Sequence, residues 1–315
     1  QSTWGFTSIP LTMKTNSSGA KYILLHPYIH NQRSYSRPWL IVTVIFFLFV
    51  MAFIGSFYFT KESLICRTSE PKTITVSTAA LPEAVTHSLL HYATMPNNKD
   101  DMSYSDIKRV ADVLAKCSPC NFLVFGLNHE ALLWKALNHN GRTEFVDENR
   151  YHAAYFEQMH PGVDVFDVLF TTQAKDMKEL MASAKESGRS DCRPVQNLMF
   201  SECVIGINDL PNHVYEVDWD VILVDGPSGF APTTPGRMTS IFTAAVLGRS
   251  KKGNSKTHVF VHDYYRDVER LYSEEFLCKE NVVDELDGAL AHFVLHPMED
   301  TSASLFCQNS PSATS

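Results

Sequence analysis

Residues 121–149 read NFLVFGLNHEALLWKALNHNGRTEFVDEN, and they give the clearest indication of the fold. The apolar run at 121–125 predicts a buried strand, and Gly126 predicts the turn that ends it. Residues 130–137 carry apolar side chains at helical spacing, and 143–146 form a second short apolar run. A strand, a helix and a strand within so short a stretch predict a βαβ unit whose two strands run parallel.

The same alternation continues toward the C-terminus. Near-continuous apolar runs of this kind are typical of strands covered on both faces, so the sequence predicts an α/β fold with a mainly parallel sheet and helices on both faces. Further strands are expected at 163–170, 220–224, 258–261 and 291–295. Further helices are expected at 83–93, after the capping residues Ser103 and Ser105, and at 152–159, 175–185 and 237–247.

A long apolar segment, WLIVTVIFFLFVMAFIGSFYF, occupies residues 39–59 and contains no charged side chain. About 20 apolar residues in a helix span the hydrocarbon core of a bilayer. Cleaved signal peptides have shorter apolar regions that end in a small-residue cleavage site. Because this run ends in aromatic residues and is followed by Lys61, we expect an uncleaved transmembrane signal anchor.

Charge is distributed unevenly on the two sides of this segment. Residues 1–38 hold four of the 27 bases and no acid, which leaves 23 bases against 35 acids for the rest. Positive-inside bias therefore predicts a cytosolic basic tail at 1–38 and type II topology. A luminal stalk is expected at 60–82, a luminal domain at 83–298 and a disordered tail at 299–315. The acidic balance of the luminal part argues against a nucleic-acid partner.

Seven cysteines fit a compartment in which disulfides form. Their spacing does not reveal which of them pair, and Cys117 and Cys120 lack a second pair at zinc-site spacing. We expect structural thiols or bridges. The odd number leaves one cysteine over, and Cys66, next to the membrane segment, is a candidate for joining two chains.

The carboxyl ends of parallel strands are where ligands bind in such sheets. Gly126 and Asn128 follow the first strand, where they either let the backbone approach a ligand or simply form a tight turn. Asp147 and Glu148 follow the second strand, where a carboxylate accepts hydrogen bonds from a ribose diol or caps the next helix. The sequence leaves each pair of alternatives open.

Three more polar residues follow the fourth and fifth strands. Asp225, His262 and Asp263 are expected around one cleft, where they could take a proton from a sugar hydroxyl, or where Asp225 and Asp263 could hold a divalent metal ion. The alternative is a structural network of polar groups. The D-x-D sequence at 218–220 precedes its strand, so we do not expect it at the ligand edge.

Several stretches of the chain resemble a known family. They are 121–149, INDLPNHVYEVDWDVILVDGPSG (207–229), PGRMTSIFTAAVL (235–247) and THVFVHDYYRDVER (257–270). They are similar to the plant polysaccharide-biosynthesis family that contains glucuronoxylan 4-O-methyltransferases and irregular-xylem-fifteen proteins. The resemblance covers roughly residues 83–296, and YILLHPY (22–28) is most similar to the irregular-xylem-fifteen branch.

This resemblance implies a class I methyltransferase-like, Rossmann-like domain that uses S-adenosylmethionine. Gly126 and Asn128 would border the methionine part of the cofactor, and Asp147 or Glu148 the ribose. Asp225, His262 and Asp263 would face the acceptor hydroxyl and any divalent metal. Arg237 is a candidate partner for a uronate.

The resemblance also implies residence in the Golgi membrane and a role in xylan biosynthesis in the plant secondary wall. The expected partners are xylan or a related wall polysaccharide and other Golgi xylan-synthesis proteins. Two activities stay open, namely methylation of a sugar hydroxyl and a non-catalytic role as scaffold or regulator. The methyltransferase branch reads G-L-G-H-D-S at the first turn, whereas Asn128 replaces the second glycine here, and a side chain at that position would crowd a cofactor.

Overall fold

The computed structural model describes residues 42–51, 81–95, 102–286, 289–299 and 305–307. The chain divides into two units, residues 1–74 and 75–315. In the first unit, residues 42–51 are helical and belong to the predicted segment 39–59, the rest of which lies outside the described residues. Among the described residues, no helix has both the length and the apolar character needed to cross a membrane. The anchor, the two tails, the stalk and the domain boundaries therefore stay predictions.

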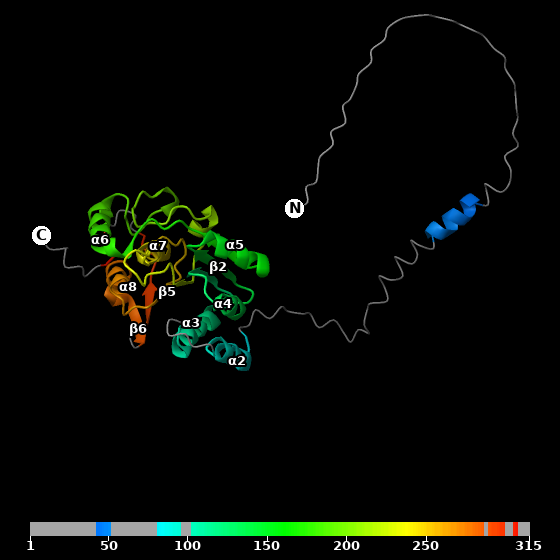
Figure 1. The fold of residues 1–315 in the computed structure, drawn as a ribbon, viewed down its shortest axis with the longest axis horizontal. Coiled ribbons are helices and arrows are strands. Elements are labelled where there is room, and N and C mark those ends of the chain that lie inside the picture. Colours follow the sequence, from blue (N-terminus) through cyan, green and yellow to red (C-terminus); the bar gives the residue numbers. More distant parts are fainter. Residues whose placement is uncertain (1–41, 52–80, 96–101, 287–288, 300–304, 308–315) are drawn as a thin grey trace, which may run out of the picture. The chain divides into compact units, whose positions relative to one another are not determined.

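A seven-stranded sheet forms the centre of the second unit (Figure 1). The strand order is β3-β2-β1-β4-β5-β7-β6; the first five strands are parallel, and β7 is antiparallel to both of its neighbours. Because antiparallel β7 lies between β5 and β6, this order differs from the 3-2-1-4-5-6 order of the dinucleotide-binding fold. The strands are β1 (Asn121–Phe125), β2 (Arg142–Asp147), β3 (Asp164–Asp167), β4 (Val221–Val224), β5 (Thr257–His262), β6 (Val282–Leu286) and β7 (Leu290–Leu295).

Helices cover both faces of the sheet, as the sequence predicted. Successive side chains of a strand point to opposite faces, and β1 follows this rule. Phe122 and Val124 belong to one buried cluster together with α2, α3, α4 and α5, whereas Leu123 and Phe125 belong to another with α6, α7 and α8. These helices are α2 (Glu83–Ala93), α3 (Tyr104–Cys117), α4 (Ala131–Leu137), α5 (Arg150–Met159), α6 (Met177–Glu186), α7 (Met238–Arg249) and α8 (Asp267–Ser273).

The start of α3 shows how local sequence sets an element. The Ser103 hydroxyl accepts a hydrogen bond from the Asp106 backbone N–H at 3.2 Å, and the Asp106 carboxylate accepts one from the Ser103 N–H. This capping box satisfies two N–H groups that a helix start otherwise leaves unpaired. Ile107, Val110 and Leu114 then bury one face of the helix. The structure confirms the capping signal at Ser103.

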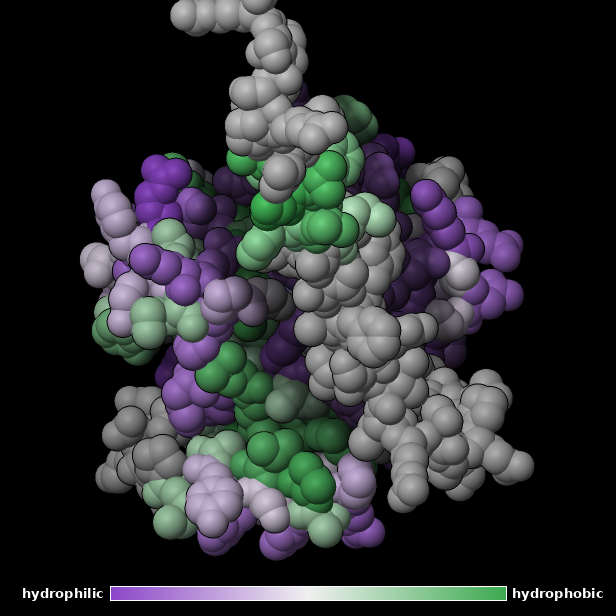
Figure 2. All heavy atoms as spheres, turned by 90° about the vertical axis from the view of Figure 1, so that its right-hand side faces the viewer, coloured by the Kyte–Doolittle hydropathy of each residue, from purple (hydrophilic) through white to green (hydrophobic). Residues whose placement is uncertain are grey.

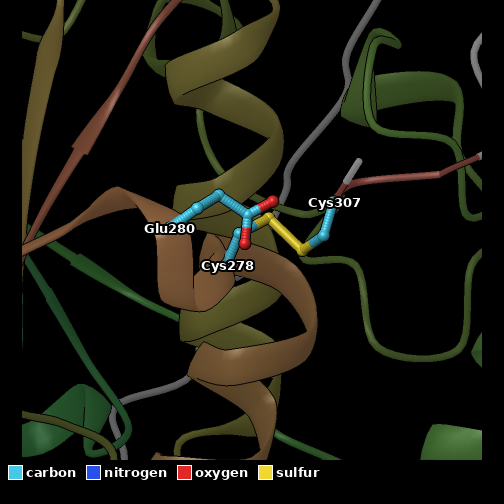
Figure 3. A group of neighbouring side chains, drawn as sticks. All are labelled: Cys278, Glu280 and Cys307. Carbon is cyan, nitrogen blue, oxygen red and sulfur yellow. A yellow bond between two sulfur atoms is a disulfide. The ribbon is translucent and has the colours of Figure 1, made fainter. Parts of the chain in front are cut away.

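Six of the seven cysteines form three disulfides in the described residues, Cys117–Cys120, Cys192–Cys203 and Cys278–Cys307. Cys66 lies outside them. Figure 3 shows the Glu280 carboxylate beside the Cys278–Cys307 bridge, a grouping of potential metal ligands. Because both sulfurs are bonded to each other, neither is a thiolate available to a metal. The bridge instead fastens the segment 305–307 to the body of the domain.

The paired Cys278→Ser and Cys307→Ser variant should lower the unfolding free energy by about 3.5 kcal/mol. This bridge spans a sequence separation of 29, and the stabilisation by a disulfide grows with the length of the loop that it closes. The paired Cys117→Ser and Cys120→Ser variant opens a bridge of separation 3 and should lose only about 2 kcal/mol. Urea unfolding of both double-serine variants in non-reducing buffer measures the difference. An equal or larger loss in the Cys117–Cys120 variant would contradict the loop argument.

The face shown in Figure 2 carries both hydrophilic side chains, in purple, and apolar side chains, in green. Val85 on α2 and Leu132 on α4 are examples of exposed apolar side chains. Scattered side chains of this kind are normal on folded domains, and by themselves they identify no binding site.

Candidate functional site

A cavity of about 520 Å3 lies at the carboxyl ends of β1, β2, β4 and β5. The chain leaves β1 toward β2 on one side, and β4 pairs with β1 on the other, so this is the switch point where open α/β sheets bind ligands. Its volume falls within the range of roughly 300–1,000 Å3 common for ligand pockets. Six of the seven predicted site residues line it, namely Gly126, Asn128, Asp147, Glu148, Asp225 and Asp263.

Gly126 is required by backbone packing at the floor of this cavity. Its φ is +113°, and a Cβ there would lie 2.9 Å from the carbonyl carbon of Asp225. Gly226 meets it from the other side, because a Cβ on Gly226 would lie 2.6 Å from the Gly126 Cα. The two glycines therefore let the turns after β1 and β4 touch. This supports the tight-turn alternative, and the turn also shapes the ligand edge.

Asn128 links the same two turns through its side chain. Its Nδ2 donates a short hydrogen bond to Oδ2 of Asp225. Among the described residues, the non-glycine positions with positive φ are Asn140, Asp263 and Cys278, so the backbone of Asn128 needs no glycine. The amide joins the turns after β1 and β4. That it crowds a cofactor stays a prediction.

Asp147 and Glu148 both line the cavity at the end of β2. Asn149, not either acid, caps α5, and the Asp147 Oδ1 accepts a hydrogen bond from the Asn149 backbone N–H at 2.8 Å. Burial raises the pKa of Asp147 above its ordinary value. Glu148 Oε1 accepts a hydrogen bond from the Ser228 hydroxyl at 2.7 Å, which connects the end of β2 to the loop after β4. Neither acid is therefore explained as a helix cap.

Asp225, His262 and Asp263 meet at one point, as their positions after adjacent strands predicted. His262 Nδ1 lies 2.8 Å from Asp225 Oδ1. Arg237 lies between the two acids, with its Nη2 3.2 Å from Asp225 Oδ1 and 2.9 Å from Asp263 Oδ2. Arg266 Nη1 approaches Asp263 Oδ2 at 2.8 Å. The result is a buried network in which each acid contacts at least one cation.

The network shifts the pKa values of its central pair in opposite directions. Burial alone would raise the pKa of Asp225, but the hydrogen bond from His262 and the charge of Arg237 outweigh it and lower the pKa below its ordinary value. Burial alone would lower the pKa of His262, but the hydrogen bond and charge of Asp225 outweigh it, so the net shift is upward. The pair favours an ionised aspartate beside a protonated imidazole.

This pair predicts a defined pH dependence of stability. His262, with a raised pKa, stabilises the fold fully below the unfolded histidine pKa of about 6.5 and loses that contribution as pH rises through the folded value. Asp225, with a lowered pKa, contributes fully above the unfolded aspartate pKa of about 3.9 and loses its contribution as pH falls through the folded value. The stabilisation is therefore complete between about pH 4 and 6.5.

The variant His262→Gln tests this pH dependence. At pH 5.5 we expect it to be less stable than the wild type by about 1.5–3 kcal/mol, the contribution of a charge-assisted hydrogen bond. The deficit should shrink at pH 9. Denaturant unfolding at the two pH values measures it, with His91→Gln on the exposed side of α2 as the control. A deficit that does not change with pH would contradict the assignment.

The predicted divalent-metal site is not favoured by this arrangement. Asp225, His262 and Asp263 offer ligand atoms within 4.8 Å of one another, which is close enough for one ion. The Arg237 guanidinium already supplies positive charge to both carboxylates. A divalent cation would have to enter against this charge, so the donor set fits a guanidinium better than a metal.

Arg237 is not available to a uronate in this structure. It is buried, its Nη1 donates to the His262 carbonyl oxygen at 2.7 Å, and its other contacts go to acids of the protein. Glu269 on α8, which the sequence did not single out, is fully buried, with its Oε1 3.9 Å from Arg237 Nε. Burial raises the pKa of Glu269. The one feature of the sequence that could have pointed to Glu269 is its position shortly after His262 and Asp263, at the end of β5.

The D-x-D sequence lies at the opposite end of β4, as predicted. The Asp218 carboxylate accepts hydrogen bonds from the backbone N–H groups of Lys252 and Gly253. The Asp220 carboxylate accepts one from the Asn121 N–H at 2.9 Å. Both acids therefore stabilise loops at the amino end of the sheet, away from the cavity.

Comparisons with known proteins point to one family. The sequence profile of the IRX15/IRX15L/GXM family matches residues 105–293. The chain is 54% identical to Protein IRX15-LIKE of Arabidopsis thaliana, over 93% of this chain and 94% of that protein. It is 53% identical to Protein IRREGULAR XYLEM 15 of the same plant, over 93% and 95% of the two chains.

More distant relatives carry an enzymatic name. The chain is 39% identical to Glucuronoxylan 4-O-methyltransferase 3 of Arabidopsis thaliana, over 72% of this chain and 74% of that protein. A solved methyltransferase-like protein from Silicibacter pomeroyi overlaps with a TM-score of 0.30 at 13% identity, covering 70% of this chain and 91% of that one. This TM-score is too low to support a conclusion about the fold.

Proposed function

Because this chain belongs to the IRX15/IRX15L/GXM family, we propose that it acts in the biosynthesis of xylan and that its sheet domain binds S-adenosylmethionine. The observation that carries the proposal is the cavity at the switch point of a methyltransferase-like sheet, which joins the acids after β2 to the polar network after β4 and β5. We propose a sugar hydroxyl of xylan or a related wall polysaccharide as the methyl acceptor.

The residues along the cavity fit the polar groups of this cofactor. Asp147 and Glu148 stand where carboxylates accept hydrogen bonds from a ribose diol. Gly126 and Asn128 border the part of the cavity between β1 and β4, where the methionine part would lie. Glu148 Oε1 accepts hydrogen bonds from the Ser228 hydroxyl and backbone N–H, so Oε2 is the oxygen that would accept from the ribose. The cofactor supplies an electrophilic methyl group.

The chain's own contribution to transfer is orientation and removal of a proton from the attacking hydroxyl. A carboxylate that lines the cavity, Asp225 or Asp263, would accept the proton of the attacking hydroxyl. His262 would orient Asp225 through the contact of its Nδ1. His262 does not line the cavity, whereas Asp225 and Asp263 do, so the acids would contact the acceptor and the imidazole would lie behind them.

A second candidate is a non-catalytic scaffold or regulator of the xylan-synthesis machinery. One observation favours it. The carboxylate of Asp225 already accepts hydrogen bonds from Asn128, Arg237 and His262, which leaves it little capacity for a substrate. The domain would then keep its fold while organising other xylan-synthesis proteins.

Isothermal titration of the purified full chain with S-adenosylmethionine tests the cofactor proposal. Binding that weakens at least tenfold in Asp147→Asn, with Asp164→Asn on the exposed start of β3 as the matched control, would support it. The absence of heat up to millimolar cofactor would overturn it. Incorporation of labelled methyl groups into xylan separates the two candidates, since a scaffold transfers none.

We also propose residence in the Golgi membrane with the sheet domain in the lumen, because the apolar segment 39–59 follows a basic tail. Protease protection in sealed vesicles tests this topology. A domain digested from outside without detergent would overturn it.

A further inference from the structure

Two exposed aromatic side chains flank an arginine at the mouth of the cavity. Phe230, in the loop after β4, is 78% exposed and lines the cavity. Tyr265, after β5, is 63% exposed, and the Arg266 guanidinium lies 5.7 Å from the centre of its ring. Tyr265 does not itself line the cavity, but its ring lies against Arg266, which does. The two aromatic side chains therefore lie on either side of one arginine and are not isolated exposed residues.

Arg266 connects the segments that carry the two aromatic side chains. It lines the cavity, and its Nη1 would lie 3.9 Å from a Cβ built on Gly229, the residue before Phe230. The loop after β4 therefore packs against Arg266, whose guanidinium lies over the Tyr265 ring. Phe230, Arg266 and Tyr265 thus form a row that joins the segments after β4 and β5, and Arg266 contacts Asp263 of the network at 2.8 Å.

Arg266 is the more exposed of the two arginines that line the cavity. Arg237 is buried and contacts three acids of the protein, whereas the Arg266 side chain is 22% exposed and makes its short ion pair with Asp263 alone. That ion pair holds the guanidinium in place while part of its donor fork remains on the cavity side. A planar guanidinium of this kind donates to sugar hydroxyls or carboxylates in a defined geometry.

From this row we infer an acceptor-binding subsite, in which Phe230 and Tyr265 stack against the apolar faces of pyranose rings and Arg266 donates to their oxygens. The inference rests on the proposed function, because it names where the polysaccharide lies relative to the cofactor cavity. A linear glycan crosses the rim, and a hydroxyl of one of its sugar units points toward Asp225 and Asp263. Rings on the rim suit a polymer, which is too long to enter a closed pocket.

Titration of the full chain with xylohexaose tests the subsite. Phe230→Ala and Tyr265→Ala should each weaken binding about tenfold, the effect of losing one buried aromatic contact. The matched controls are Phe200→Ala and Tyr155→Ala, whose parent side chains are 79% and 62% exposed and neither line the cavity nor lie against Arg266. Both controls should bind xylohexaose as the wild type does. S-adenosylmethionine affinity, measured on the same samples, should be equal in Tyr265→Ala and the wild type, because Tyr265 lies outside the cavity lining.

The outcomes separate the subsite from the cofactor proposal. Equal losses in the rim variants and in their controls would overturn the subsite, and so would a wild-type chain that binds no xylohexaose at millimolar concentration. Loss of xylohexaose binding in the rim variants alone would support the subsite even if the chain bound no S-adenosylmethionine. In that case the cofactor proposal would fail while the glycan subsite stood.

Discussion

Replacing Gly126 with alanine should lower the unfolding free energy by about 3–5 kcal/mol, the sum of overpacking and left-handed strain. The added Cβ would lie 2.9 Å from the carbonyl carbon and oxygen of Asp225 and 3.0 Å from the Gly226 nitrogen. All three are backbone atoms, which cannot move aside as a flexible side chain would. The turns after β1 and β4 would have to separate, and the cavity between them would change shape.

Gly162 provides the control that isolates the steric effect. Its φ is +93°, also in the region that favours glycine, but a Cβ there would meet nothing within 4 Å. The variant Gly162→Ala should therefore lose only about 1–2 kcal/mol, the cost of left-handed strain alone. Urea unfolding of both variants compares the two costs. Similar losses would show that φ, not the contact between the two turns, makes Gly126 necessary.

The parallel part of the fold could be predicted because each strand forms a short apolar run next to an amphipathic helix. Residues 121–125 are a strand with the predicted bounds. No clear pattern predicted β6, whose ladder with β7 has a register shift between Val282 and Asp284. None predicted α8 either, which has seven residues and too few turns to show a periodicity. Short or irregular elements depend on tertiary packing more than on local pattern.

The site residues at the ends of strands could be predicted from the sequence. The site residues whose position depends on how a helix is oriented could not. Asp225, His262 and Asp263 follow neighbouring parallel strands, so their proximity follows from the topology. Arg237 and Glu269 come from the starts of α7 and α8, and only the packing of those helices turns them toward the network. A charged residue in a helix is normally solvated, so the burial of Glu269 could not be predicted from the sequence.

The cation at the centre of the network should be as important for stability as the glycine turn beneath it. Arg237→Met keeps much of the side chain's volume but removes the charge that Asp225 and Asp263 contact at 3.2 and 2.9 Å. We expect a loss of about 3–5 kcal/mol, because buried carboxylates are left without their partner. The exposed ion pair of Arg270 with Asp267 offers the matched control, and Arg270→Met should unfold as the wild type does.

The deficit of Arg237→Met should also depend on pH. Without the guanidinium, the pKa values of Asp225 and Glu269 rise, because its charge lowers both. A carboxylate whose folded pKa is raised costs stability that returns as pH falls through that value. The deficit should therefore be smaller at pH 5 than at pH 8. Adding Glu269→Gln should recover part of it, because both Glu269 carboxylate oxygens are buried without a hydrogen-bond partner in the described structure. Equal deficits for Arg237→Met and Arg270→Met would show instead that the buried network contributes no more than a surface ion pair.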